Sequence, residues 1–219
     1  MHKPIFAFLI GFFCLSASGQ SLNKLIQQAT ELHDQRKQNI FSDQKESLDQ
    51  RFDSCMQALL RHPDFCGIDS VEIARLVRAT AAEPRESGQY FAYHLINFVA
   101  IASAENLMVF SWDDLGGGTY HTYTNYVQYQ LTDGSCVVQP LDTAEHDWDA
   151  GYYQTEKLEL AGRNIYVLLG YGTFGGGKQH RKVKFLERID DALVERMDFY
   201  PDGKQLTISS NRGQDPALT

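Results

Sequence analysis

The sequence lacks the short motifs that identify the common catalytic classes. It has no Gly-x-Ser-x-Gly elbow, no His-Glu-x-x-His pair and no Cys-x-x-Cys. Hydrolases with a nucleophile elbow, zinc proteases and thiol redox proteins therefore have no support from motifs. An enzyme is not excluded, because a glycosidase needs only two well-placed carboxylates. We expect a non-catalytic protein without a cofactor.

Positive charge is scarce, and long apolar runs are almost absent. The chain has 20 basic and 28 acidic side chains, for a net charge of −8. An acidic surface repels phosphate backbones and anionic lipids, so we expect neither nucleic acid nor the membrane surface as a partner. No long apolar stretch follows the N-terminus, so we expect no transmembrane segment. Roughly 200 residues remain, enough to bury a core.

The N-terminus has the pattern of a secretory signal peptide. Residues 1–3 are a short basic start, and residues 4–15 are apolar and uncharged. Ala17 and Gly19 place small side chains where a signal peptidase cuts, which predicts cleavage before Gln20. The apolar run is shorter than the roughly 20 residues that span a bilayer. We therefore expect an exported, soluble protein, either secreted or periplasmic.

Three cysteines remain after cleavage. The oxidising environment of an exported protein permits a disulfide. Cys55 and Cys66 lie on either side of the turn at residues 62–64, and their closeness in sequence predicts that they pair. Such a bond stabilises a fold by roughly 2–3 kcal/mol. We expect Cys136 to be a buried thiol.

Helical periodicity marks the first part of the mature chain. Apolar side chains recur at steps of three and four in two runs: Leu22, Leu25, Ile26, Ala29 and Leu32, then Leu48, Phe52, Cys55, Met56, Leu59 and Leu60. Pro63 ends the second run. Asp69 and Glu72 form a capping box, which predicts a third helix to about Ala82. Residues 83–88 are typical of a linker.

From Tyr90 the apolar period changes to two, as in β-strands. Five groups of turn residues interrupt this pattern: Glu105-Asn106, Asp133-Gly134, Gly162-Arg163-Asn164, Asp190-Asp191 and Asp202-Gly203. Their close spacing predicts consecutive antiparallel strands rather than strands joined through helices.

An internal repeat lies within this β-rich region. The pattern Gly-Gly-Gly-x-x-His occurs at residues 116–121 and again at 175–180, an offset of 59. Each copy follows one hairpin-like pair and precedes another. We therefore predict two four-strand units, at residues 93–142 and 152–199. A further strand is expected at 204–210.

These patterns predict an α+β fold. The expected order is a signal peptide (1–19), a helical region (20–87) and an antiparallel β domain (88–219) that contains both repeats. Two four-strand units cannot close a propeller ring, which needs four or more blades. An open twisted sheet or a sandwich packed on the N-terminal helices fits the length.

One short segment resembles a known structural motif. Ser111-Trp112-Asp113 and the following Gly117-Gly118-Thr119-Tyr120 are similar to the Asp-box, a hairpin motif of sialidase-like propellers. The resemblance covers about ten residues. In that family the motif is structural and lies away from the catalytic site, so the resemblance implies a hairpin and no activity.

The glycine loops and their neighbours are the candidate ligand site. Glycine allows a ligand to approach the backbone closely, and aromatic rings beside carboxylates are typical of sugar-binding surfaces. The candidate residues are Trp112, Asp113, Gly117, His121, Tyr171, Gly176 and His180. Each has a structural alternative: the glycines as wide hairpin loops, the aromatics as core, and the histidines as strand residues or as a metal pair.

Carboxylates gather between the two repeats. The candidates are Asp142, Glu145, Asp147 and Asp149. Carboxylates on a turn suit calcium, but the spacing is not that of an EF-hand, and a solvated connector is the alternative. We therefore expect no metal site, with calcium as the open alternative. Asp113 or Asp114, paired with Glu145 or Asp149, could also serve as the two acids of a glycosidase.

Three functional hypotheses follow. The first is an exported binding module that holds a ligand, possibly a glycan, or an envelope partner through the glycine loops. A carbohydrate-active hydrolase that uses loop carboxylates is the second. The third is an envelope assembly protein that pairs through a strand edge at residues 204–210.

Overall fold

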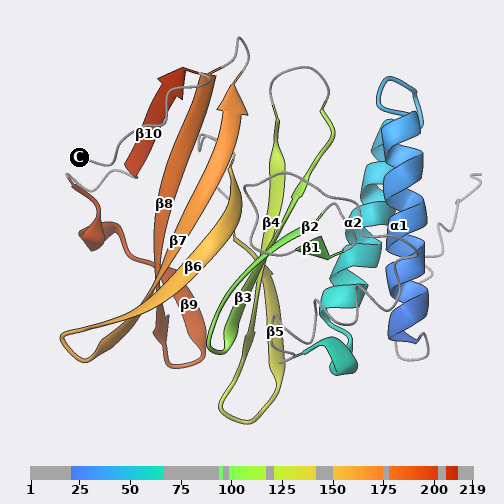
Figure 1. Cartoon of the computed structure of the whole chain (residues 1–219). Helices are drawn as coiled ribbons and strands as arrows, with labels where there is room; N and C mark the ends of the chain where they lie inside the picture. The colour runs from blue at the N-terminus through green and yellow to red at the C-terminus, as the bar shows by residue number, and fades with distance from the viewer. Residues whose placement is uncertain are drawn as a thin grey trace, which may run out of the picture.

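The computed structural model describes most of the chain after the N-terminal segment (Figure 1). The described residues are 21–66, 94–95, 99–116, 121–141, 150–174, 178–201 and 206–211. The predicted signal peptide, the third helix at 69–82 and the linker at 83–88 lie outside them.

Two helices precede two antiparallel sheets, which confirms the α+β class. The helical elements are α1 (Leu22–Gln38), α2 (Lys45–Leu60) and the short 3₁₀ turn η1 (Pro63–Phe65). The first sheet consists of β1 (His94–Leu95), β2 (Val99–Ala104), β3 (Leu107–Asp113), β4 (Tyr123–Gln130) and β5 (Cys136–Pro140), in that order. The second consists of β6 (Gly151–Leu160), β7 (Arg163–Phe174), β8 (Lys178–Ile189), β9 (Ala192–Glu195) and β10 (Leu206–Asn211), with the 3₁₀ turn η3 (Met197–Phe199) after β9.

The two predicted units coincide with two antiparallel meanders. Strands β2 to β5 follow one another in the first sheet, and β6 to β8 do so in the second, with β9 paired to the far edge of β8. Each sheet also has one strand more than four, the two-residue β1 and the C-terminal β10. Both Gly-Gly-Gly runs fall in equivalent connections, between β3 and β4 and between β7 and β8. In the described part of the second sheet β10 is outermost, beyond β8, so pairing through this edge stays a proposal.

The predicted turns join these strands where the backbone needs a left-handed residue. Glu105 and Asp190 have φ of 49° and 53° in the loops that follow β2 and β8. Between β6 and β7 the two-residue loop places Ala161 at φ 51° and Gly162 at φ 75°, one residue before the predicted position. Two successive positive φ values match the right-handed twist of a hairpin. The predicted turn at residues 202–203 lies outside the described residues.

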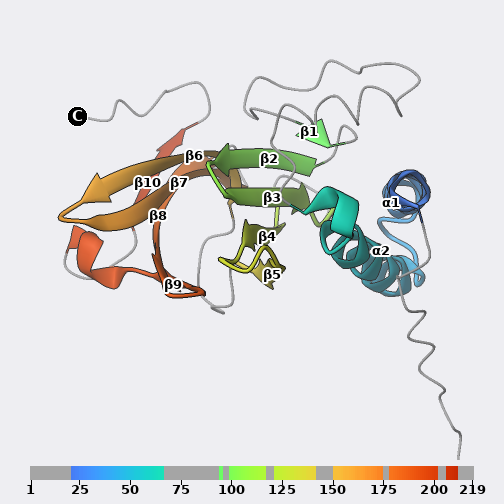
Figure 2. The same ribbon diagram turned by 90° about the horizontal axis from the view of Figure 1, so that it is seen from below.

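Three layers result, with the first sheet in the middle (Figures 1 and 2). Met108, Phe110 and Trp112 of β3 pack toward the helices, in a cluster that includes Phe52 and Phe65. The alternate residues of β3 pack toward the second sheet. Because both faces are covered, β3 is apolar almost throughout rather than alternating.

Buried polar side chains join the two sheets. The Ser111 hydroxyl donates to Asn125 Oδ1 at 2.6 Å and accepts from the backbone N–H of Tyr152 at 2.9 Å. Asn125 Nδ2 donates to the carbonyl of Ala150 at 3.0 Å. Buried polar groups cost free energy unless they are paired, so this network holds the start of β6 against the middle of the first sheet.

The predicted disulfide between Cys55 and Cys66 is wrong. Cys66 bonds to Cys136, 70 residues away, with their Cα atoms 5.9 Å apart, so Cys136 is not a free thiol. Among the described residues Cys55 is the free cysteine: its buried side chain faces the helix core, with Sγ 3.7 Å from the carbonyl of Leu25. Cys55 continues the apolar face of α2, whereas η1 turns Cys66 toward β5. Closeness in sequence was therefore the wrong criterion.

Candidate functional site

A pocket of about 380 Å³ opens between the helix layer and the first sheet. Its lining residues are Arg36, Asp49, Gln50, Phe52, Asp53, Trp112, Asp114 and Thr124. They come from α1, from α2, from the end of β3 and the turn after it, and from the start of β4. The volume lies in the range of small-molecule sites, which is roughly 300–1,000 Å³.

The helices bring a buried cation to this pocket. The buried face of α1 runs through Leu25, Ala29 and Leu32 and ends at Arg36, four residues further on. Arg36 is only 2% exposed, and its guanidinium carbon lies 4.3 Å from the centre of the Phe52 ring. Its Nε donates to Asp49 Oδ1 at 2.6 Å. A buried guanidinium is expensive unless it is paired, and Asp49 supplies the pairing.

One nitrogen of Arg36 is left without an acceptor. Nη1 is buried and has no hydrogen-bond partner among the residues that the structure describes. A buried donor without a partner costs about 1–3 kcal/mol, more when it is charged. The pocket is therefore lined by a side chain with an unused donor.

Aromatic rings form one wall. Trp112 stacks on Tyr126, with ring centres 5.4 Å apart and planes inclined by 13°, and meets Phe52 edge-on at 6.0 Å. Trp112 is 3% exposed, so it is mainly a core residue with a small part of its surface at the pocket. The Tyr126 hydroxyl accepts from Gln57 Nε2 at 2.9 Å and lies 3.4 Å from Asp53 Oδ1. These contacts hold the side chain of Asp53 in place at the α2 edge of the pocket.

Two carboxylates in the pocket have pKa values displaced in opposite directions. Burial raises the pKa of Asp114, although the hydrogen bond that Thr124 Oγ1 donates at 2.6 Å and the charge of Arg36 oppose it. Burial would also raise the pKa of Asp49, but hydrogen bonds from Lys45 and Arg36 outweigh it and lower the pKa. Asp49 thus stays ionised at lower pH than Asp114.

A second polar group lies just beyond the pocket. His121 Nδ1 is 2.5 Å from Asp113 Oδ2, and the other oxygen of Asp113 accepts from the backbone N–H of Leu115 at 2.8 Å. Leu115 has a φ of 54°, a conformation that this hydrogen bond helps to hold. Two of the sequence-based candidates, Asp113 and His121, are therefore brought together.

The strand ends that lead to the two glycine runs lie at the same end of the molecule. Strand β7 ends, and strands β4 and β8 begin, at the top of Figure 1. The ring of Tyr123, at the start of β4, lies so close to Gly151 that a Cβ there would be 2.9 Å from Cδ1. Gly151 pairs with Tyr171. Burial, together with the charges of Asp113 and Tyr171, raises the pKa of Tyr123.

The remaining candidates are divided between the core and the segments outside the described residues. Tyr171 is buried, with the Arg181 guanidinium carbon 5.1 Å from its ring centre. His180 is buried on β8, in a different sheet from the strand that follows His121. Six candidates lie outside the described residues: Gly117, Gly176, Asp142, Glu145, Asp147 and Asp149. Within the described ranges, no three His, Cys, Asp or Glu side chains are grouped to hold a metal ion.

The helix side of the pocket was missed by sequence reasoning. Arg36 carried a usable signal, because it is a charged residue that continues the apolar stripe of α1. Asp49 and Thr124 carried none, since an acid on a helix and a threonine in a strand are common on any surface. Only the packing of α2 against the first sheet brings them to one place.

Comparisons with known proteins add no relative. No family model, no curated protein and no solved structure matches this chain. The likeness of residues 111–120 to the Asp-box stays an interpretation that rests on those residues alone. Of the helices that the structure describes, none is long and apolar enough to cross a membrane.

Proposed function

We propose that this chain is an exported, non-catalytic binding module that holds a small polyhydroxylated ligand, such as one sugar unit of a glycan, in the pocket between α2 and the first sheet. The observation that carries the proposal is the lining itself. Aromatic rings, carboxylates and an arginine with an unused donor meet in a cavity of about 380 Å³.

The chemistry of a sugar suits this lining. Each hydroxyl both donates and accepts a hydrogen bond, so it can donate to a carboxylate while it accepts from a guanidinium. The apolar face of a sugar ring can lie against aromatic surface. Asp114 and Arg36 supply the two polar partners, and the rings of Phe52 from α2 and Trp112 from β3 lie in the same lining.

The export part of the proposal rests on the N-terminal sequence. Residues 4–15 are apolar, and Ala17 and Gly19 precede the expected cleavage point. The disulfide between Cys66 and Cys136 is compatible with an oxidising compartment. N-terminal sequencing of the exported protein should begin at Gln20; retention of Met1 would contradict export by this route.

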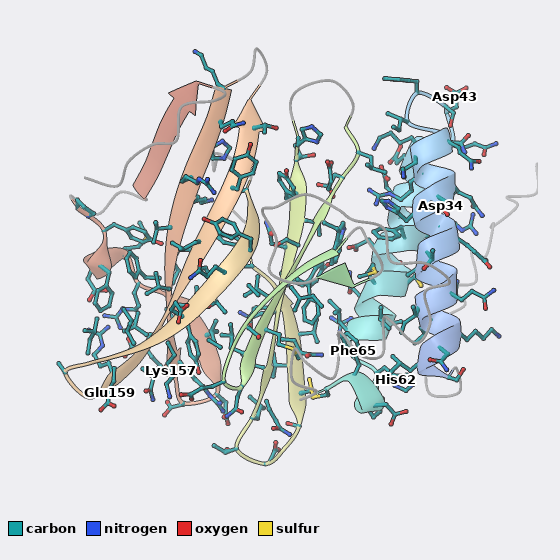
Figure 3. The ribbon with its side chains drawn as sticks, in the orientation of Figure 1. Asp34, Asp43, His62, Phe65, Lys157 and Glu159 are labelled. Atoms are coloured by element: carbon teal, nitrogen blue, oxygen red, sulfur yellow. A yellow bond between two sulfur atoms is a disulfide. The ribbon has the colours of Figure 1, made fainter. Side chains whose placement is uncertain are left out.

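Binding can be tested with a single matched pair of variants. We expect neutral mono- and oligosaccharides to include a ligand detected by calorimetry, and Asp114→Asn to weaken its binding about tenfold, the effect of one hydrogen bond to a charged group. Asp34→Asn is the control, because Asp34 is exposed on α1 and does not line the pocket (Figure 3). Equal affinity of both variants, or no binding by any sugar, would refute the proposal.

Hydrolysis of a glycan is the second candidate function. The observation in its favour is that Asp114 and Asp49 line one pocket with pKa values displaced upward and downward, the pattern of an acid paired with an ionised carboxylate. Release of reducing ends from a glycan, abolished in Asp114→Asn, would support it. Binding without release in the wild-type protein would leave the binding module as the function.

A further inference from the structure

We infer that Arg36 anchors the ligand through Nη1 and that the pocket therefore selects neutral sugars over acidic or amino sugars. This inference rests on the proposed function and adds to it the class of ligand and the residue that selects it. Arg36 Nη1 is buried and has no acceptor in the described part of the chain.

The guanidinium is held in place on two sides. Asp49 accepts from Nε at 2.6 Å, and the ring of Phe52 lies 4.3 Å from the guanidinium carbon. The other oxygen of Asp49 accepts from Lys45 Nζ at 2.5 Å, so this carboxylate is fixed in turn. Because Arg36 cannot turn without losing these contacts, Nη1 is a donor of fixed position. A preorganised donor binds an acceptor without a further cost in side-chain ordering.

Charge around the pocket decides which acceptor fits. The lining has one guanidinium and three carboxylates, of Asp49, Asp53 and Asp114. Asp49 is neutralised by Arg36 and Lys45, whereas Asp53 and Asp114 form no ion pair within the described part of the chain. A ligand carboxylate drawn to Arg36 would therefore meet two further carboxylates, and like charges at close range are unfavourable.

A ligand ammonium group meets the opposite difficulty. It would be drawn to Asp53 and Asp114 but, because it has no acceptor, it would leave Nη1 of Arg36 unpaired beside a like charge. A hydroxyl avoids both repulsions, because its oxygen accepts from Nη1 while its proton goes to a carboxylate. Neighbouring hydroxyls on a neutral sugar match a fixed donor beside fixed acceptors.

A purely structural Arg36 is the competing explanation. In that case Nη1 would be satisfied by a bound water, as other buried polar atoms often are. The arginine would then affect stability but not the choice of ligand. The two explanations differ in affinity and in selectivity, both of which can be measured.

The test uses the exported protein and three probes: a neutral hexose, the corresponding uronic acid and the corresponding amino sugar. We expect the neutral hexose to bind most tightly. Arg36→Lys should weaken its binding by at least about tenfold, because a lysine that pairs with Asp49 has no second fixed donor. Arg51→Lys is the matched control on the exposed side of α2. Circular dichroism and thermal melting establish that both variants fold.

The outcomes separate the inference from the proposed function. Unchanged hexose affinity in Arg36→Lys, with weakened affinity in Asp114→Asn, would overturn the inference and leave the binding module intact. Tighter binding of the uronic acid or the amino sugar would also overturn it, whereas failure of every sugar to bind would refute both. If Arg36→Lys does not fold, the side-chain ¹⁵N resonances of Arg36 in the wild-type protein decide: a saturable shift with the hexose supports the inference, and no shift overturns it.

Discussion

The two sheets share a sequence pattern but differ in what covers them. The first sheet lies between the helices and the second sheet, so side chains on both faces of β3 are buried. The second sheet packs against the first through one face, with side chains such as Tyr152 and Leu168. Its other face carries ion pairs and several exposed apolar side chains, among them Leu158 and Val194. A repeated pattern of strands has therefore not produced two equivalent environments.

The two histidines of the repeat show what this difference means. His121 is 39% exposed and pairs with Asp113 at the end of the first sheet, whereas His180 is buried within the second. Helices α1 and α2, which pack on the first sheet, supply Arg36 and Asp49 beside Asp114 and Thr124 of one repeat. Repetition of Gly-Gly-Gly-x-x-His thus indicates that the two sheets share a strand arrangement. The candidate site depends on the helix layer, which is not repeated.

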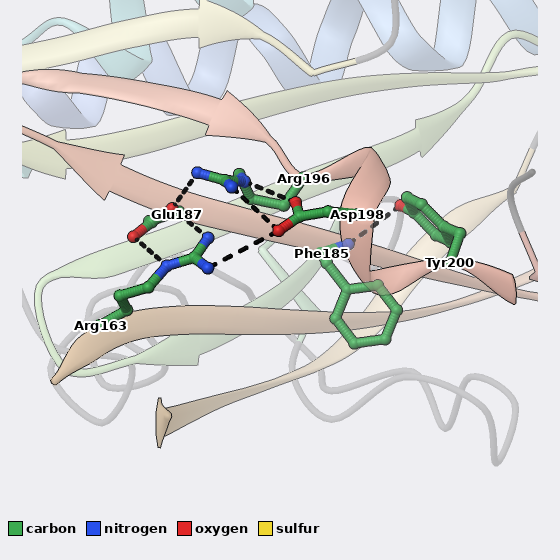
Figure 4. A network of polar contacts seen from close by, with 6 residues as sticks. All are labelled: Arg163, Phe185, Glu187, Arg196, Asp198 and Tyr200. Atoms are coloured by element: carbon green, nitrogen blue, oxygen red, sulfur yellow. Dashed lines mark hydrogen bonds and ion pairs between the residues drawn. The ribbon is translucent and has the colours of Figure 1, made fainter. Parts of the chain in front are cut away.

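Ion pairs lie on the outer face of the second sheet, beside Phe185, whose ring packs against Phe199 and Tyr200 (Figure 4). Arg163 of β7 donates to both oxygens of Glu187 on β8, at 2.8 and 2.7 Å. Arg196 joins Glu187 to Asp198, which belongs to η3. The network ties the segment after β9 to the sheet. Salt should therefore affect this region more than the buried first sheet.

The largest loss of stability is expected when a large side chain is removed from the first sheet. Phe110 is fully buried and lies 5.8 Å from the ring of Phe65, which Figure 3 places beside the end of α2. Phe110→Ala should lower the free energy of unfolding by about 3–5 kcal/mol. Val194→Ala, on the partly exposed β9, should change it by about 0.5 kcal/mol or less. Urea denaturation measures both; equal losses would contradict the contrast between the sheets.

Removal of the disulfide should cause the next largest loss of stability. Cys66→Ser combined with Cys136→Ser should cost about 2–4 kcal/mol, because the closed loop is long. The loss is expected to loosen η1 from β5, in the first sheet and not in the second. Mass spectrometry after alkylation should find Cys55 as the thiol and the other two bonded. A bond that includes Cys55 would contradict the structure.

Protonation of His33, on α1, should make the stability of the helix layer depend on pH in the mildly acidic range. Burial, and then the charges of Arg36 and Lys37, lower the pKa of His33 from 6.5 to about 4. Between these values the unfolded chain binds the proton and the folded chain does not, so stability falls as pH falls from 6.5 to 4. His33→Gln should remove this part of the pH dependence, measured by denaturation at pH 7, 5.5 and 4.5. An unchanged slope would contradict it.

The second sheet should respond at lower pH and more weakly. The hydrogen bond from Arg163 lowers the pKa of Glu187, and that from Arg196 lowers the pKa of Asp198. Their stabilisation is therefore present at neutral pH and is lost as pH falls below about 4.5, the ordinary value for Glu. Glu187→Gln should reduce stability at pH 7 but change little at pH 3. Glu159→Gln, at the exposed end of β6 (Figure 3), should have no such effect.

Local features were predictable from the sequence, and contacts between layers were not. The turns at Asp133-Gly134 and Asp190-Asp191 were found because the chemistry of a hairpin loop is contained in its own residues. The Cys66–Cys136 bond was missed because the packing of η1 on β5 determines it. The pocket was predicted only in part. Trp112 and the neighbouring acids were identified, but Arg36 was not, because only the packing of the helices on the first sheet brings it to the pocket.

The pocket beside Trp112 is proposed to bind a neutral sugar. The chain has two tryptophans, so the indole N–H signal of Trp112 can be assigned in the NMR spectrum with a Trp148→Phe variant. In a titration with a neutral hexose this signal should shift in a saturable way, and the shift should be much weaker in Arg36→Lys. No shift at any concentration, or the same shift and affinity in both proteins, would contradict the account.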